Sequence, residues 1–141
     1  MVRALTLLYD ATAGDAWSNH SNWLAGEPCI DGWFGVHCCP ELLPILQGDT
    51  CTSVSGELTT APSTQGSAAC HSGSATGTAA DHATCVVVKV MLPSNNLIGP
   101  LDALDPEASE RALCGLAYLQ HLDLSGNSRQ RALEPCLRIA R

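Results

Sequence analysis

The chain has 141 residues, and 45% of them are hydrophobic, which is enough for one domain with a buried core. A formal net charge of −7 argues against binding to a nucleic-acid backbone, because that partner requires a basic surface. Aromatic residues make up only 4% of the chain, so leucine, valine and alanine must supply most of the core.

Eight cysteines in a chain this short favour an oxidising compartment. No signal peptide is visible, because the apolar run that begins at Ala4 is interrupted at Asp10. No run approaches the roughly 20 apolar residues that a membrane-spanning helix needs. We therefore expect no membrane segment, and either an intracellular chain or one whose true N-terminus is missing; of the two, we favour the interpretation that the chain is a piece of a longer protein.

The first predicted element is an amphipathic helix over residues 2–13. Its apolar residues recur at helical spacing, which places them on one face: Ala4, Leu7, Leu8 and Ala11. Gly14 is a suitable end for this helix, since glycine tolerates the left-handed conformation. A loop-rich segment with three tryptophans follows, and together these parts form a first unit over residues 2–39.

Residues 40–85 form a second unit with a different composition. Serine, threonine, glycine and alanine dominate it, and few large apolar residues are available for burial. Conformational entropy should outweigh packing in such a segment, so we predict a flexible insertion. Three cysteines within it could form covalent links: Cys51, Cys70 and Cys85.

Residues 86–141 form a third unit, which contains the same spacing of apolar residues and asparagine twice. The first copy reads Val87-x-x-Val90-x-Leu92-x-x-Asn95-x-Leu97, and the second reads Leu119-x-x-Leu122-x-Leu124-x-x-Asn127. We predict short parallel strands around Leu92 and Leu124, with each asparagine turned inward to bond the backbone of the bend. The residues after 127 show no further clear copy.

These motifs resemble the plant-type leucine-rich-repeat proteins. Residues 4–39 are similar to the N-terminal cap of that family, most specifically in the segment Pro28-Cys29 through Asp31-Gly32-Trp33-Phe34-Gly35-Val36-His37-Cys38. The resemblance implies an α/β solenoid made of a cap and about two repeats. It also implies a Cys29–Cys38 disulfide and structural roles for the repeat residues Leu92, Asn95, Leu97, Leu122, Leu124 and Asn127. The chain departs from the family in the spacing of 32 positions from Asn95 to Asn127 and in the long insertion.

The resemblance predicts a noncatalytic module from a receptor-like or secreted protein, located outside the cell or at its surface. Its ligand would be a protein, peptide or glycan, with no nucleic acid and no cofactor. Strand positions between the leucines would contact this ligand: Lys89, Met91, Gln120, His121 and Asp123. His121 and Asp123 face one side of a strand, but no nucleophile or oxyanion donor accompanies them, which argues against catalysis.

Several alternatives remain open. Two Cys–His pairs in the insertion could bind zinc in a small metal-dependent enzyme: Cys70, His71, His82 and Cys85. Cys29, His37, Cys38 and Cys39 are a second possible metal cluster. The tryptophans could form a ligand platform, although the cap resemblance favours a structural role. Asn19-His20-Ser21 is a glycosylation sequon if the chain is secreted. The chain could also be a nonfunctional gene fragment.

Overall fold

The computed structural model describes residues 2–41, 44–47, 50–52, 60–62, 85–99 and 115–128. This part contains one α-helix, α1 (Val2–Ala11), and a short 3-10 helix, η1 (Gly14–Ala16). Its strands are β1 (Val36–Pro40), β2 (Ile45–Gln47), β3 (Thr50–Thr52), β4 (Thr60–Pro62), β5 (Cys85–Met91) and β6 (His121–Asp123). None of the helices in these ranges is long and apolar enough to cross a membrane.

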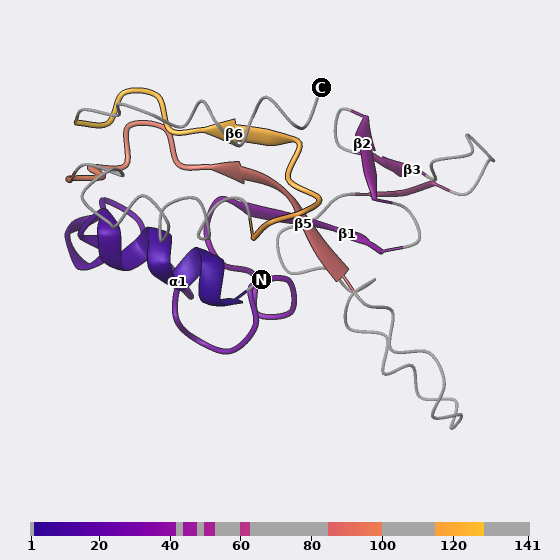
Figure 1. Cartoon of the computed structure of the whole chain (residues 1–141), viewed down its shortest axis with the longest axis horizontal. Coiled ribbons are helices and arrows are strands. Elements are labelled where there is room, and N and C mark those ends of the chain that lie inside the picture. The colour runs from indigo at the N-terminus through magenta and orange to yellow at the C-terminus, as the bar shows by residue number, and fades with distance from the viewer. Residues whose placement is uncertain are drawn as a thin grey trace.

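The strands form two small sheets. In the main sheet the order is β1-β5-β6, with β1 antiparallel to β5 and β6 parallel to it. In the second sheet the order is β2-β3-β4, and both pairs are antiparallel. Figure 1 shows α1 along one side of the main sheet, while β2 and β3 lie away from α1, near β1 and β5.

The predicted α/β solenoid is wrong. A leucine-rich solenoid stacks parallel strands that are added one per repeat, but β1 runs antiparallel to β5. The described residues contain two three-stranded sheets and one ten-residue α-helix, rather than a stack of repeats. The two motif copies do form a strand each, and these strands are parallel neighbours. A short spacing pattern encodes this local strand and turn, but not the architecture around them.

A β-bulge in β5 directs some of its side chains into the main core and others into a second buried cluster on the opposite face. Cys38 pairs with Val87 while His37 pairs with Lys89, so Val88 is an extra residue on β5 at a bulge. Val87 and Val90 belong to the main core, which includes residues of α1, whereas Val88 belongs to a second cluster. We call the face of the main sheet that bears α1 the inner face, and the opposite face the outer face.

The predicted N-terminal helix is confirmed over Val2–Ala11, but its buried face differs from the expected one. Leu5 and Leu8 are completely buried, together with most of Ala4 and Tyr9, whereas Leu7 is only half-buried. The helix ends where Ala13 adopts a left-handed conformation. A Cβ atom on the next residue, Gly14, would overlap the ring of Tyr9, so this position requires glycine.

The three tryptophans and Tyr9 form an aromatic cluster in the main core. Adjacent ring centroids are 5.0 Å apart for Tyr9 and Trp17, 4.7 Å for Trp17 and Trp23, and 5.0 Å for Trp23 and Trp33. Each indole N–H donates to a backbone carbonyl, so none of these polar groups is buried without a partner. Burial of all three rings makes their role structural.

Candidate functional site

The outer face of the main sheet brings together most of the side chains predicted to contact a ligand. In the register of β5 and β6, Lys89 lies opposite His121, and Met91 lies opposite Asp123. Side chains at such paired positions share one face of a sheet, so these four residues form a two-by-two group. We call this group the open patch.

Strong packing on the inner face holds the open patch in place. Val90 on β5 and Leu92 directly after it, which alternate with Lys89 and Met91, are completely buried. On the other strand, Leu122 packs against the same core and Leu124 is buried within it. The inward side chains therefore fix the direction of the outward ones, as alternation along a strand requires.

His37 extends the open patch onto β1, a contribution that the sequence analysis did not assign. It lies directly opposite Lys89, which lies opposite His121 on the other side. The only sequence signal for this position was the short alternation of apolar and polar residues in Val36-His37-Cys38, and in the structure Val36 and Cys38 are buried while His37 is half-buried. Two histidine side chains and one lysine side chain thus form one row across the three strands of the main sheet.

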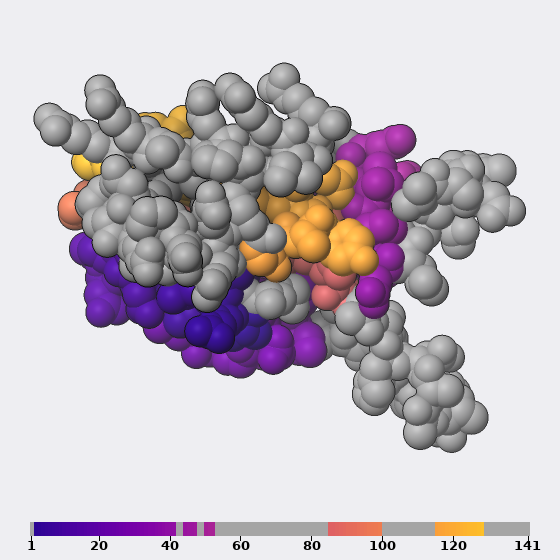
Figure 2. Space-filling model, in the orientation of Figure 1, coloured from indigo at the N-terminus to yellow at the C-terminus, as the bar shows by residue number. Residues whose placement is uncertain are grey.

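The second sheet covers the other part of the outer face. Leu46 and Cys51 from the second sheet pack in one buried cluster with Cys39, Val86 and Val88 from the main sheet. Figure 2 shows the same neighbourhood from outside, where atoms of the 115–128 segment lie beside the magenta β2 segment. The second sheet therefore covers one part of the outer face, and the open patch lies on another part of it.

A disulfide between Cys39 and Cys51 joins the two sheets covalently. Its Cα atoms are 5.7 Å apart, and both cysteines are completely buried. The sequence analysis left this pairing unassigned. Closing a loop with a separation of 12 residues stabilises the folded state by about 3 kcal/mol in the chain-entropy model.

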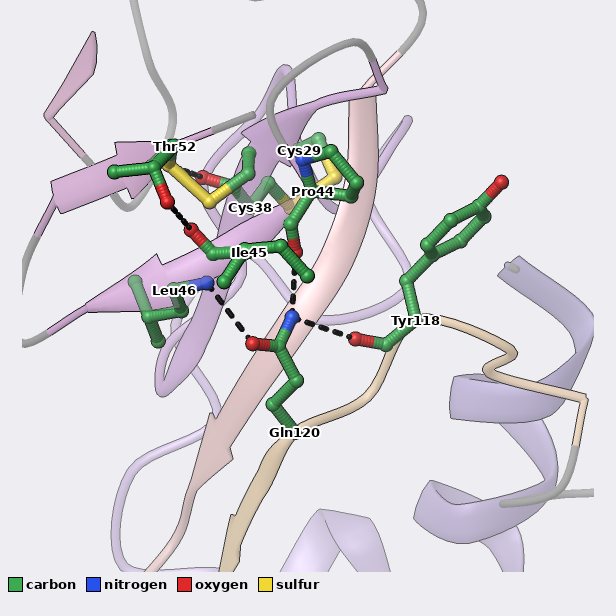
Figure 3. The surroundings of a disulfide bond; sticks show 10 residues. Cys29, Cys38, Pro44, Ile45, Leu46, Thr52, Tyr118 and Gln120 are labelled. Atoms are coloured by element: carbon green, nitrogen blue, oxygen red, sulfur yellow. Dashed lines mark hydrogen bonds between the residues drawn. A yellow bond between two sulfur atoms is a disulfide. The ribbon is translucent and has the colours of Figure 1, made fainter. Parts of the chain in front are cut away.

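Gln120 provides a polar connection between the same two sheets. Its Oε1 accepts a hydrogen bond from the backbone N–H of Leu46 at 2.9 Å, and its Nε2 donates to the carbonyl of Pro44. Nε2 also lies 3.3 Å from the carbonyl of Tyr118 (Figure 3). Both the oxygen and the nitrogen of this amide are thus bonded within the protein. A residue that contacts a ligand would need one of these atoms free, so Gln120 has a structural role here.

Asp123 is the acidic member of the open patch. The backbone N–H of Ser125 donates to its Oδ1 at 2.9 Å. Hydrogen bonds from the side chain and backbone of Ser125 lower the pKa of Asp123 below its usual value. This carboxylate is therefore ionised at neutral pH and lies one row away from Lys89 and His121.

The two motif asparagines occupy matching positions at the bends that follow β5 and β6. Asn127 Oδ1 accepts from the backbone N–H groups of Asn95 and Leu97 at 2.8 and 3.0 Å, and its Nδ2 donates to the carbonyls of Leu92 and Leu124. Asn95 is buried and makes a similar pair of bonds to the backbone of Asn19. Both side chains therefore hold neighbouring bends together, and neither points to a ligand.

The expected cap disulfide is present, with Cys29 bonded to Cys38 and a Cα–Cα distance of 5.7 Å. Cys85 is disulfide-bonded as well, and no described cysteine is free. Such bonds form and persist in an oxidising environment. Among the described residues, no group of three or more histidine, cysteine and acidic side chains could hold a metal ion.

The disulfides bear on both metal alternatives. Cys29, Cys38 and Cys39 are all in disulfides, so their sulfurs are not available as thiolate ligands beside His37. Cys85 is equally unavailable for zinc in the insertion. The remaining ligands of that candidate zinc site lie outside the described residues: Cys70, His71 and His82.

Comparison with protein-family models, curated proteins and solved structures finds no match to this chain. The function must therefore be argued from the residues and the geometry of the open patch.

Proposed function

We propose that this chain is a noncatalytic recognition module whose ligand binds at the open patch formed by Lys89, Met91, His121 and Asp123. The observation that carries this proposal is the register of β5 and β6, which places the four side chains on one face of a strand pair. Their chemistry is mixed, with an amine, an imidazole, a thioether and a carboxylate. A patch of this kind suits a protein, peptide or glycan ligand with both polar and apolar groups.

The cap segment supports a kinship with plant-type leucine-rich-repeat recognition proteins as part of this proposal. The cysteines of the most specific motif form the implied disulfide, and its tryptophan, Trp33, is completely buried. The bonds of Asn95 and Asn127 also match the role that the resemblance implies for them. This kinship and the disulfides favour an extracellular or cell-surface location.

The proposal is tested by mapping where a selected ligand binds. The chain, purified with its disulfides intact, is used to select binders from a displayed library of random peptides and to probe a glycan array. A photoreactive amino acid is then placed at exposed His121 or, as a control, at exposed Arg3 on α1. We expect the selected ligand to crosslink from position 121 and not from position 3. Crosslinking only from position 3 would contradict the proposal.

A further inference from the structure

Asn19 lies in a loop between η1 and Trp23, outside the open patch, and begins the sequence Asn19-His20-Ser21. This is an acceptor sequence for N-linked glycans, since the middle residue is not proline. The sequence alone leaves it equally consistent with a chance match in a polar loop. The local geometry decides between these two interpretations.

Ser21 contacts the amide of Asn19 through two hydrogen bonds. Its backbone N–H donates to Asn19 Oδ1 at 3.0 Å, and its hydroxyl donates to the same oxygen at 2.7 Å. Two donors on Oδ1 stabilise the negative charge that develops on this oxygen when Nδ2 gives up a proton. The arrangement thus favours reaction at the otherwise unreactive amide nitrogen.

The nitrogen atom itself is left available. Within the described part of the chain, Asn19 Nδ2 makes no hydrogen bond, because the side-chain bonds of this residue all end on Oδ1. Asn19 is half-buried, and its neighbours His20, Ser21 and Asn22 are all exposed. A glycan on Nδ2 would therefore extend into solvent without displacing a protein contact.

The backbone of Asn19 keeps this site in position. Its N–H donates to Asn95 Oδ1 at 2.7 Å, and its carbonyl accepts from Asn95 Nδ2 at 2.8 Å. These bonds use only main-chain atoms of Asn19, so modification of its side chain leaves them intact. Cys29, Cys39 and Cys85 are all disulfide-bonded, and such bonds form in an oxidising compartment. N-linked glycans are added in a compartment of the same kind.

We infer that Asn19 is an N-glycosylation site. The donor is an oligosaccharide linked through a diphosphate to a polyprenol. A bond forms between Asn19 Nδ2 and the anomeric carbon of the first sugar, and the bond between that carbon and the diphosphate oxygen breaks. Nδ2 loses one proton, the polyprenyl diphosphate leaves, and nothing is oxidised or reduced.

The test is translation of the full chain behind a cleavable secretory signal, in a cell-free system with microsomes. Only the protease-protected fraction is scored, so that failure to enter the microsomes is not mistaken for failure of modification. We expect one glycan that peptide N-glycosidase removes. It should be absent from the Asn19→Gln and Ser21→Ala variants and present in the Ser21→Thr variant.

Ser18→Ala is the matched control, because Ser18 is an exposed serine of the same loop outside the acceptor sequence. This variant should carry the glycan in the same fraction as the wild type. Protease-protected wild-type chain without a glycan would overturn the inference. So would a glycan that persists after Asn19→Gln.

Discussion

Asn95 illustrates how one polar side chain can organise a bend at the residue scale. It is buried, and its amide meets both the N–H and the carbonyl of Asn19. When one partner of a buried hydrogen bond is removed, the remaining group stays buried away from water without a hydrogen bond, and this lowers the free energy of unfolding. The same reasoning applies to Asn127, whose amide connects the bends after β5 and β6.

We predict that Asn95→Ala lowers the free energy of unfolding by about 2 kcal/mol, because two backbone groups of Asn19 lose their partner. Urea-induced unfolding provides the measurement. Asn19→Ala is the matched control, since it retains both backbone groups and should cost less than about 1 kcal/mol. Equal losses for the two variants would contradict this role of Asn95.

Tyr9 is a titratable residue in the aromatic cluster. Its hydroxyl donates to Asp15 Oδ1 at 2.8 Å. Burial raises the pKa of Tyr9 above 10.0, and the hydrogen bond and negative charge of Asp15 raise this pKa further. The folded chain therefore retains a proton that the unfolded chain loses at alkaline pH, so stability falls as the pH rises from about 10 towards the folded pKa.

A Tyr118→Phe variant isolates Tyr9, because the chain has two tyrosines. We predict that its phenolate absorbance titrates with a midpoint above 10 when folded and at about 10 in concentrated urea. Adding Asp15→Asn should move the folded midpoint only partway down, since burial is the larger cause. A folded midpoint at or below 10 would contradict the burial of this hydroxyl.

At the element scale, the second sheet is the feature that the sequence analysis did not anticipate. A segment rich in serine, threonine and glycine gave little reason to expect strands, yet it contributes β2, β3 and β4. Their stability depends on partners distant in sequence, namely Cys39 and Gln120. A local composition argument cannot detect such partners, and residues 42–43, 48–49, 53–59 and 63–84 lie outside the described ranges.

The parallel pairing of β5 with β6 was predictable from local pattern. Its apolar positions recur at the same spacing in both copies, and this spacing also defines the outward positions Lys89, Met91, His121 and Asp123. The antiparallel neighbour β1 was not predictable in this way. It overlaps the end of the cap motif, where the alternation Val36-His37-Cys38 is too short to indicate a strand by itself.

We predict that Gln120→Ala loosens the second sheet without unfolding the main sheet. Loss of the bond to Leu46 should speed hydrogen exchange at the Leu46 amide about fivefold, which corresponds to about 1 kcal/mol. Nuclear magnetic resonance measures this rate. The Met91 amide, which donates to Gly35 within the main sheet, should remain protected.

His121→Ala serves as the control, because His121 is the exposed neighbour of Gln120. Exchange at Leu46 should be unaffected in this variant. An unchanged Leu46 rate in Gln120→Ala would show that the glutamine does not hold the second sheet in place.

At the scale of the whole molecule, two separate sheets pack together, and the second sheet covers part of the outer face of the main sheet. The inner face is occupied by α1 and the aromatic cluster, and part of the outer face by the second sheet. Two disulfides fix this arrangement at β1, through the adjacent residues Cys38 and Cys39. The open patch lies on another part of the outer face, where His121 is exposed and Lys89, Met91 and Asp123 are half-buried.

The same scale explains why the solenoid prediction was wrong. Two motif copies specify two parallel strands, but their number and spacing do not specify what lies beside them. The insertion adds a second sheet, and β1 adds an antiparallel strand, neither of which the repeat pattern encodes. Resemblance described the local bends and the Cys29–Cys38 pair better than the architecture.

The most direct test of the central claim is the affinity of a selected peptide for paired variants of the chain. Lys89→Ala and His121→Ala remove an amine and an imidazole from the open patch, while Arg3→Ala removes a guanidinium from the exposed face of α1. We predict that at least one patch variant weakens binding about tenfold, or about 1.4 kcal/mol, and that Arg3→Ala leaves the Kd unchanged. Unchanged Kd values for both patch variants would contradict the claim that this patch is the recognition surface.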